Sequence, residues 1–205
     1  MDTVTEIRQQ YARVLEPIEW QQFKAVAEYY FETAAKLKKQ DINSAKKMKL
    51  LLRNSQKRLF LGIGCELLLK SIYLKNGYCI NKIRNNDSIP NLPINKYRNL
   101  RPEHVDANNT FTLGTLIDQL TNILNLSREK SQLIDRGLRI GMVFRNKEGH
   151  VSFPVHRYEP QNYRDVENSI ASLYDCVYGE ELVFRVSMEA NEVHSFNIKK
   201  HITKR

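Results

Sequence analysis

Apolar residues recur at steps of three and four along much of the chain, which is the period of an amphipathic helix. One such stretch runs from Pro17 to about Lys39, and a second begins near Asn43 or Ser44, either of which can cap it, and stops at Asn76-Gly77. At 1.5 Å per residue the second helix would be about 50 Å long. The expected apolar faces are Phe23, Val26, Ala27, Tyr30, Ala34 and Leu37 in the first helix, and Met48, Leu51, Leu52, Leu59, Ile63, Leu67 and Ile72 in the second.

Two glycines, Gly62 and Gly64, lie inside the second pattern, in the segment LFLGIGCELLLK. Glycines hold phosphate groups when they follow a strand and open a helix. Here no strand precedes them and apolar residues flank both. The pattern therefore favours close helix packing or a kink over a phosphate loop.

The helical period disappears from Tyr78 to about Asn109, where three prolines, many Asn and the basic segments NKIRNN and NKYRNLRP predict an insertion loop, partly mobile. Helical patterns then resume, with Thr112 and Ser127 as caps of two helices and Gly179 near the end of a fifth. Their apolar positions are Leu113, Leu116, Ile117, Leu120, Ile123 and Leu124, then Leu133, Ile134, Leu138, Met142 and Phe144, then Val166, Ile170, Leu173 and Val177.

The last stretch alternates apolar and polar residues, with Phe184, Val186 and Met188 before Ala190-Asn191 and Phe196 and Ile198 after it, which is typical of a hairpin. Five helical patterns without strand-helix-strand alternation predict an all-α fold, an antiparallel up-and-down helical bundle with a C-terminal β-hairpin. We expect the bundle over residues 1–182, with a loop insertion at 78–110, and a hairpin with a basic tail over 183–205.

Composition fits a single globular domain: 205 residues, of which 41% are hydrophobic and 27% charged. A chain of this length can form a core without disulfides or a structural metal. Cys65, Cys79 and Cys176 are far apart and form no CxxC pair, so we expect three reduced thiols. The N-terminal segment MDTVTEIRQQ has no signal-peptide pattern and no long apolar run follows, which predicts a cytoplasmic protein without a membrane partner.

Thirty-two Lys and Arg against 23 Asp and Glu give a formal charge of +9 and a pI near 9.4. A charge of this size attracts polyanions, so nucleic acid is the first partner to test. Many helical proteins are equally basic and bind nothing, so the charge needs a site to support it.

The segment Arg145-Asn146-Lys147-Glu148-Gly149-His150 combines groups suited to RNA cleavage. A neutral imidazole can take the proton of a ribose 2'-hydroxyl or protonate a leaving oxygen, while a guanidinium holds the scissile phosphate. Arg145 and His150 would lie about 140° apart on an unbroken helix, so we expect the helix to end or bend between them, at Asn146 or Gly149. A solvated Arg and a surface His in a polar turn fit the same spacing.

This segment resembles the motif of the HEPN family, small helical bundles in which an Arg, a polar residue and, a few positions later, a His lie late in the third or fourth helix. Arg145, Asn146 and His150 match it in turn. The approach LIDRGLRIGMVFRNKEGH is similar to the helix that leads into the motif, and CELLLKSIYLKNGY to an earlier helix of the family. The resemblance covers roughly Pro17 to Glu181.

The resemblance implies a metal-independent endoribonuclease that needs no cofactor and acts as a homodimer with both motifs facing one cleft, as a toxin or an antiviral or stress defence effector with an antitoxin or defence-system partner. Glu66 resembles the family's accessory acidic position, although solvent exposure explains a single helical Glu equally well. The branch controlled by adenylylation has a Tyr where this chain has Ser152, so we do not expect that control. Other members bind RNA or a protein without cutting, which is the main alternative.

A second group, Tyr97, Arg98 and Arg101, combines an aromatic ring with positive charge and could stack on and hold single-stranded RNA. A solvated loop has the same composition. The remaining histidines form no HExxH pattern, so the sequence predicts no metal site. A helical interaction protein with an incidental positive charge is a third interpretation.

Overall fold

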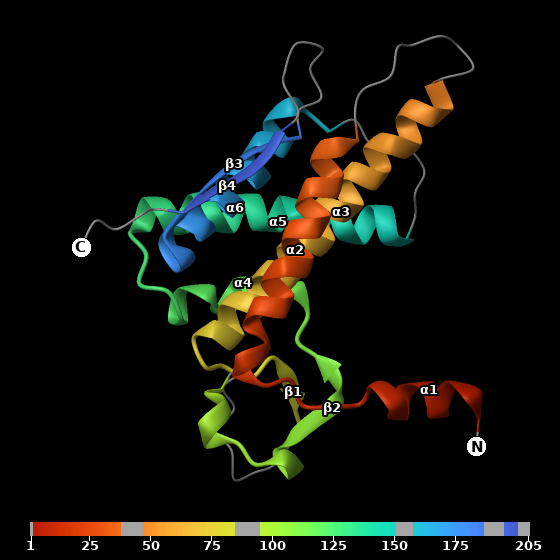
Figure 1. Cartoon of the computed structure of the whole chain (residues 1–205), viewed down its shortest axis with the longest axis vertical. Helices are drawn as coiled ribbons and strands as arrows, with labels where there is room; N and C mark the ends of the chain where they lie inside the picture. The colour runs from red at the N-terminus through yellow and green to blue at the C-terminus, as the bar shows by residue number, and fades with distance from the viewer. Residues whose placement is uncertain (1, 38–46, 85–94, 151–157, 187–194, 201–205) are drawn as a thin grey trace. The chain divides into compact units, whose positions relative to one another are not determined.

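The computed structural model of the chain describes residues 2–37, 47–84, 95–150, 158–186 and 195–200 (Figure 1). Inside the helices, the side chains of residues 47–51, 149 and 150 are not among those described. The described residues are mostly helical, with six α-helices and two small antiparallel sheets. The chain divides into a first unit, Met1–Lys24 with Leu68–Asn125, and a second unit, Ala25–Leu67 with Leu126–Arg205.

The first unit combines short helices with a small sheet. Its elements are α1 (Thr3–Tyr11), the 3-10 turns Pro17–Glu19, Tyr97–Asn99, Pro102–His104 and Leu120–Asn122, the strands β1 (Asn81–Ile83) and β2 (Val105–Thr110), and α4 (Leu113–Gln119). The start of α2 (Trp20–Lys36) and the end of α3 (Lys47–Lys75) also belong to it. Thr112 caps α4 as expected, because its hydroxyl accepts a hydrogen bond from the Thr115 amide at 3.3 Å.

The side chain of Asn81 ties the N-terminal segment to this sheet. It is 1% exposed. Its Oδ1 accepts a hydrogen bond from the Leu15 amide at 2.9 Å, and its Nδ2 donates to the Arg13 and Asp106 carbonyls at 3.2 and 3.3 Å. Because a buried amide is costly unless it is hydrogen-bonded, these three bonds fix where the N-terminal segment crosses the strands.

The expectation of an insertion loop over 78–110 is wrong for part of that stretch. β1 and β2 pair antiparallel, with Ile83 opposite Val105 and a shift of register between Asn81 and Lys82. The strands carry polar residues rather than an alternating pattern, so the sequence gives no period from which to predict them. Residues 85–94, part of the loop expected to be mobile, lie outside the described residues.

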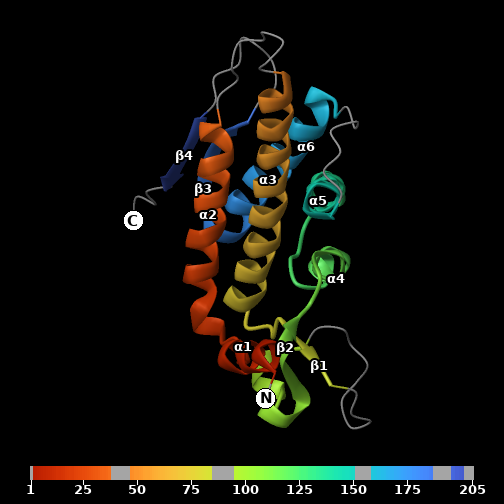
Figure 2. The ribbon, with the colours of Figure 1, turned by 90° about the vertical axis from the view of Figure 1, so that its right-hand side faces the viewer.

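The second unit contains most of α2 and α3, with α5 (Arg128–His150), α6 (Pro160–Tyr178), β3 (Glu180–Arg185) and β4 (Ser195–Lys200). Figure 2 shows α2 and α3 side by side. α3 spans 29 residues and ends at Lys75, just before the expected stop at Asn76-Gly77, where Gly77 has a φ of +76°. The caps expected for it, Asn43 and Ser44, lie outside the described residues.

α5 and α6 pack antiparallel. Lys130, near the start of α5, pairs with Asp175 near the end of α6 at 3.4 Å, while Phe144 near the end of α5 lies 5.2 Å from the ring of Tyr163 near the start of α6. The Ser127 hydroxyl accepts from the Lys130 amide at 3.4 Å, and α6 ends at Gly179, with φ +63°. Both helix ends agree with the sequence predictions.

The predicted C-terminal hairpin is confirmed. β3 and β4 pair in register, with Phe184 opposite Phe196. Phe184 packs on Phe31 of α2, ring centroids 5.5 Å apart, and Glu167 of α6 accepts a hydrogen bond from the Val186 amide at 2.5 Å. The expected turn around Ala190-Asn191 and the last five residues of the tail lie outside the described part.

The apolar faces of the later helices were predicted better than those of α2 and α3, with Leu133 of α5, which is 42% exposed, as an exception. In α2, Ala27 and Ala34 are buried as expected, but Val26 is 46% exposed and the unpredicted Phe31 is fully buried. In α3, Leu52 is 56% exposed, and the buried face contains Leu61, Cys65, Leu68, Leu69 and Ile72. Because α3 is covered on more than one side, its apolar residues do not form one stripe.

The two glycines of α3 allow close helix contacts, as the sequence favoured. A Cβ placed on Gly62 would lie 2.6 Å from the Cβ of Arg145 and from the Gly141 carbonyl oxygen, both on α5. A Cβ on Gly64 would lie 2.7 Å from Cδ1 of Phe31 on α2. α3 can therefore approach α5 and α2 only because these positions have no side chain.

We expect Gly62→Ala to lower the free energy of unfolding by about 1–3 kcal/mol, because the added methyl group meets backbone and Cβ atoms that cannot rotate away. The higher helix propensity of Ala offsets at most about 1 kcal/mol of this loss in unfolding free energy. Urea unfolding followed by circular dichroism measures the change.

The matched control is Gly77→Asn. This position has open space and a left-handed backbone that Asn tolerates. The control should shift the unfolding free energy by about a few tenths of a kcal/mol. An unchanged midpoint for Gly62→Ala would show that α3 and α5 do not approach this closely.

Candidate active site

The contact between α3 and α5 places Glu66 against Arg145. Nε of Arg145 lies 2.7 Å from Oε2 of Glu66, and their side chains are 39% and 13% exposed. Both residues belong to the second unit. The structure thus joins Arg145 to the residue that the sequence suggested as an accessory acid.

The Arg145 guanidinium keeps donors for a ligand. Its NH1 makes a hydrogen bond of 3.5 Å to Oδ1 of the exposed Asn146. A guanidinium has five N–H donors, so the bonds to Glu66 and Asn146 leave three without a partner among the described residues. A partly exposed ion pair of this kind contributes at most about 1 kcal/mol to stability, so the pair orients the guanidinium more than it stabilises the fold.

His150 is the last residue of α5, and its side chain is not among those described. The expected end or bend between Arg145 and His150 is wrong, because α5 continues through Asn146 and Gly149 to His150. Consequently the motif lies on the last turns of a helix and not in a polar turn. On an unbroken helix the two positions are about 140° apart, so one shared site requires His150 to reach around the helix end.

A buried polar cluster lies beside this helix end and was not predicted. Nε of Arg58 on α3 lies 2.5 Å from Oε1 of Glu148 on α5, with side chains 6% and 8% exposed. Ser55 donates to the other oxygen of Glu148, and NH1 of Arg58 donates to the Tyr163 hydroxyl at 3.0 Å. Removing one partner of such a buried pair costs about 3–5 kcal/mol, because the other charge is left without compensation.

The charges of the cluster support one another. Burial alone lowers the pKa of the Arg58 guanidinium, but its interactions with Tyr163 and Glu148 outweigh burial and leave that pKa above its ordinary value. Burial also raises the pKa of the Tyr163 hydroxyl, against the opposing effect of Arg58. The Arg58 guanidinium is therefore charged at neutral pH, and the Tyr163 hydroxyl beside it is neutral.

One signal in the sequence could have revealed Arg58. It lies at helical spacing from the buried residues Leu61, Cys65, Leu68 and Ile72 of the same helix. A charged residue in the register of a buried face needs a partner of opposite charge. Glu148 was visible only as one polar residue among several in the motif.

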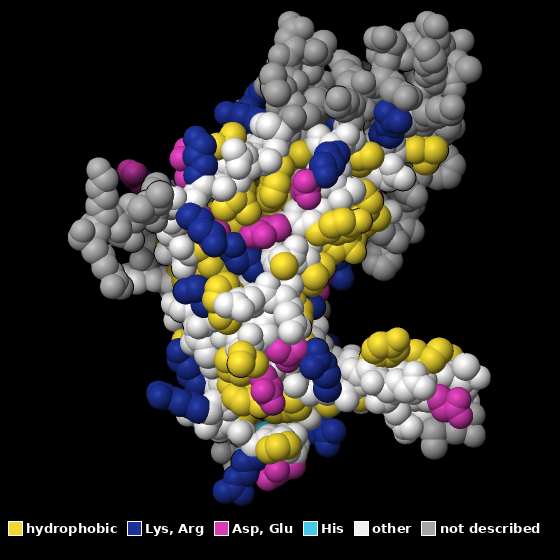
Figure 3. Space-filling view, viewed as in Figure 1, with side chains coloured by type: hydrophobic (Ala, Val, Ile, Leu, Met, Phe, Trp, Pro, Cys, Tyr) yellow, Lys and Arg dark blue, Asp and Glu magenta, His cyan; other side chains and the backbone are white. Residues whose placement is uncertain are grey.

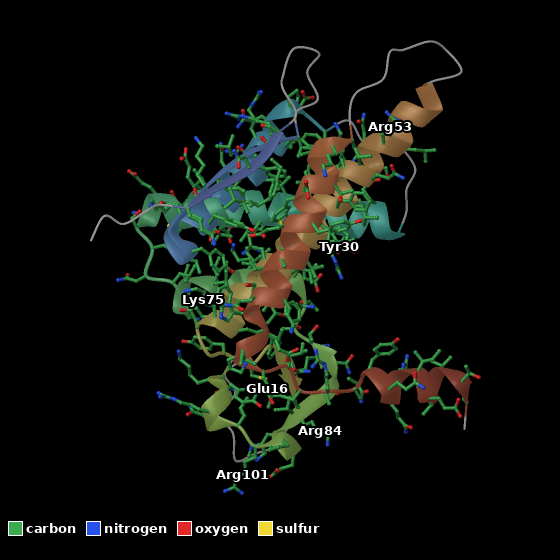
Figure 4. All side chains as sticks on the ribbon, viewed as in Figure 1. Glu16, Tyr30, Arg53, Lys75, Arg84 and Arg101 are labelled. Atoms are coloured by element: carbon green, nitrogen blue, oxygen red, sulfur yellow. The ribbon has the colours of Figure 1, made fainter. Side chains whose placement is uncertain are left out.

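Tyr97, Arg98 and Arg101 belong to the first unit and are not part of the geometry around Arg145. Arg98 and Arg101 are exposed. Arg101 lies 3.9 Å from Glu103, a weak surface pair. Figure 4 labels Arg101 together with Arg84, a second exposed arginine of this unit. Arg98 and Arg101 are therefore exposed cations of the first unit, with Tyr97 half-buried, which fits the solvated loop as well as an RNA-binding surface.

The three cysteines are free thiols. Burial raises the pKa of Cys65 to about 12 and also raises that of Cys79. Cys176 is exposed, and its sulfur accepts a hydrogen bond from Nζ of Lys130 at 3.6 Å. The three thiols should therefore differ widely in reactivity.

The described residues contain no group of three or more His, Cys, Asp or Glu side chains arranged to bind a metal ion. Within the same residues, no helix has the length and apolar character needed to cross a bilayer. Comparisons with models of protein families, with curated proteins and with solved structures find no match to this chain.

We expect a disulfide reagent such as 5,5'-dithiobis(2-nitrobenzoate) to modify only Cys176 in the native protein at pH 8, and all three thiols in guanidinium chloride. The attacking species is the thiolate, which is scarce four pH units below a pKa of about 12 and is shielded at the buried Cys65. Absorbance at 412 nm counts the thiols released. Rapid native modification that persists in Cys176→Ser would contradict the burial of Cys65 and Cys79.

Proposed function

We propose that the end of α5 is the active site of a HEPN-type endoribonuclease, a homodimeric toxin or defence effector that cuts RNA without a metal ion. The observation that carries the proposal is the 2.7 Å contact of Arg145 with Glu66. It supports the proposal because the Arg of the motif lies against Glu66, the residue that resembles the accessory acidic position of the family. Three guanidinium donors also remain for a phosphate among the described contacts.

The proposed reaction is an internal transesterification. The ribose 2'-oxygen attacks the adjacent phosphorus, the bond from phosphorus to the 5'-oxygen breaks, and the products carry a 2',3'-cyclic phosphate and a 5'-hydroxyl. His150 takes the 2'-hydroxyl proton or protonates the leaving 5'-oxygen. Arg145 binds the non-bridging phosphate oxygens and their developing charge, and Asn146 positions one of these groups.

The charge of the chain fits this substrate. The formal charge of +9 favours a polyanion, and Arg98 and Arg101 on the first unit are exposed to bind phosphates, with Tyr97 nearby for stacking. A non-catalytic module that binds RNA or a protein on the same fold is the second candidate. The exposed Arg98 and Arg101 favour it equally, and only turnover separates the two.

We expect Arg145→Ala and His150→Ala to reduce cleavage of a random-sequence single-stranded RNA pool by about 10²-fold or more, because each removes a group that acts in the transition state. Asn146→Ala should have a smaller effect. Arg139→Ala is the matched control, since Arg139 is an exposed arginine of the same helix paired with Asp135 at 2.9 Å. Gel electrophoresis of end-labelled RNA measures the rate.

Thermal unfolding of each variant separates catalysis from folding. We expect Arg145→Ala to unfold within a few degrees of wild type, because its pair with Glu66 is partly exposed. Full activity in His150→Ala would remove the acid or base from the mechanism. Loss of the folded state in that variant would make the residue structural.

Cleavage should continue in excess EDTA, because the nucleophile is a ribose hydroxyl and needs no bound metal. A strand with a single 2'-deoxy sugar at the cut site should resist cleavage yet bind with nearly the same affinity, since its phosphate contacts are unchanged. Fluorescence anisotropy measures binding and electrophoresis measures cleavage. Normal cutting of the deoxy strand, or activity that EDTA abolishes and magnesium restores, would make water the nucleophile.

A homodimer would supply two histidines and two arginines to one cleft, which suits a reaction that uses both an acid and a base. Apolar side chains on the second unit offer a surface for it. Val26 and Tyr29, one turn apart on α2, are 46% and 64% exposed, and Figure 3 shows hydrophobic side chains gathered over α2 and α3.

We therefore expect sedimentation velocity at micromolar concentration to show a dimer, and Tyr29→Glu to shift it towards monomer with loss of cleavage. An introduced charge at a dimer contact is costly because it loses its hydration. Tyr11→Glu, an exposed tyrosine on the first unit, is the control. A fully active wild-type monomer would refute the shared cleft.

A further inference from the structure

Among the described residues beside the motif, Arg58 and Glu148 form a buried ion pair with several further hydrogen bonds. Both oxygens of the Glu148 carboxylate have partners, Arg58 on one and Ser55 on the other. Arg58 in turn reaches Glu148 and the Tyr163 hydroxyl. Glu148 is two residues before His150, so this network is anchored in the last turn of the helix that carries the motif.

Two ion pairs of opposite polarity join the same two helices. α3 supplies the cation Arg58 and the anion Glu66, whereas α5 supplies the anion Glu148 and the cation Arg145. Gly62 lies between Arg58 and Glu66 on α3, at the point of closest approach. Sliding α5 by one turn along α3 would bring Arg145 towards Arg58 in one direction, or Glu148 towards Glu66 in the other, so either slide brings like charges closer. The arrangement therefore selects one register of the two helices.

Arg58 also contacts the chain beyond the motif. Its guanidinium carbon lies 4.8 Å from the centroid of the Tyr158 ring, and that ring packs against Phe144 of α5 at 4.9 Å. One arginine on α3 thus holds both Glu148, just before His150, and Tyr158, just before α6. Glu148 and Tyr158, the residues before and after the segment 149–157, therefore both contact the side chain of Arg58.

We propose that Arg58 and Glu148 are positioning residues, which hold the last turn of α5 helical and in register and thereby fix the Arg145 guanidinium and the backbone at His150 for the reaction. This inference rests on the proposed ribonuclease function. Neither side chain touches the substrate in this scheme, because both are buried. The substrate is positioned through the backbone of α5 and through the orientation of Arg145.

Glu148→Gln tests the proposal, because it keeps the shape of the side chain and removes its charge. We expect kcat on the random-sequence RNA pool to fall about tenfold or more with little change in KM, and amide hydrogen exchange of the last turn of α5 to accelerate by a similar factor. Glu167→Gln is the matched control: Glu167 is 3% exposed in the same unit and bonds the Val186 amide. It should change neither readout.

A double variant separates positioning from stability. Arg58→Met with Glu148→Gln removes both charges, which leaves no uncompensated ion, so the melting temperature should return towards wild type. We expect kcat to stay about tenfold low, because the register-selecting pair is still missing. Recovery of kcat together with the melting temperature would overturn the proposal and make the pair purely structural.

The two proposals fail in different ways. If wild-type protein cleaves no RNA, the ribonuclease function is wrong, and hydrogen exchange alone then decides whether the pair holds the helix end. If wild-type protein cleaves RNA and Glu148→Gln keeps full kcat, the positioning role is wrong and the function stands. In either case, the positioning role is wrong if the Glu148→Gln variant shows unchanged amide hydrogen exchange in the last turn of α5.

Discussion

The close approach of α3 and α5 at Gly62 determines where every charged group of the candidate site lies. A side chain at Gly62 would overlap the Cβ of Arg145 and the Gly141 carbonyl, so the two helix backbones meet almost directly. Long side chains on either side of such a contact must reach across it to the opposite helix. Arg145 consequently meets Glu66 and Glu148 meets Arg58, and the geometry of the site follows from the absence of one Cβ.

The two ion pairs at this contact have different physical roles because their burial differs. Arg145 is 39% exposed, so water screens its pair with Glu66 and the guanidinium remains accessible to a phosphate. Arg58 and Glu148 are almost fully buried, so the contribution of their pair to stability depends on its further hydrogen bonds with Ser55 and Tyr163. The partly exposed pair of Arg145 and Glu66 can therefore contact a ligand, whereas the buried pair of Arg58 and Glu148 favours one register of the two helices.

The sequence predicted the features that depend on local periodicity and capping. The end of α3 just before Gly77, the caps Thr112 and Ser127 and the C-terminal hairpin all agree with the structure. Close packing at Gly62 was predicted from its apolar neighbours, without its partner helix. The β1–β2 pairing was missed because polar strands held by the Asn81 side chain leave no hydrophobic period. The continuation of α5 to His150 was missed because Asn146 and Gly149 resemble helix-ending residues.

Within the candidate site, the motif residues could be selected from the sequence but their contacts could not. The contact of Arg145 with Glu66 depends on two residues 79 positions apart, and no spacing rule relates them. Arg58 occupies the register of a buried face, so its need for a partner could be inferred, yet the identity of Glu148 required the helix crossing. Tyr97, Arg98 and Arg101 were grouped by composition as an RNA-binding candidate, and they belong to a different unit from Arg145.

The central claim is that the end of α5 promotes attack of an RNA ribose 2'-hydroxyl on the adjacent phosphate. Mass spectrometry of the fragments from a defined RNA oligonucleotide, cut by the purified wild-type protein, tests this most directly. The account predicts that each upstream fragment carries the mass of a 2',3'-cyclic phosphate and each downstream fragment a 5'-hydroxyl, and that neither appears with His150→Ala. Fragments ending in 3'-hydroxyl and 5'-phosphate, or cyclic phosphate from the His150→Ala protein at the wild-type rate, would contradict it.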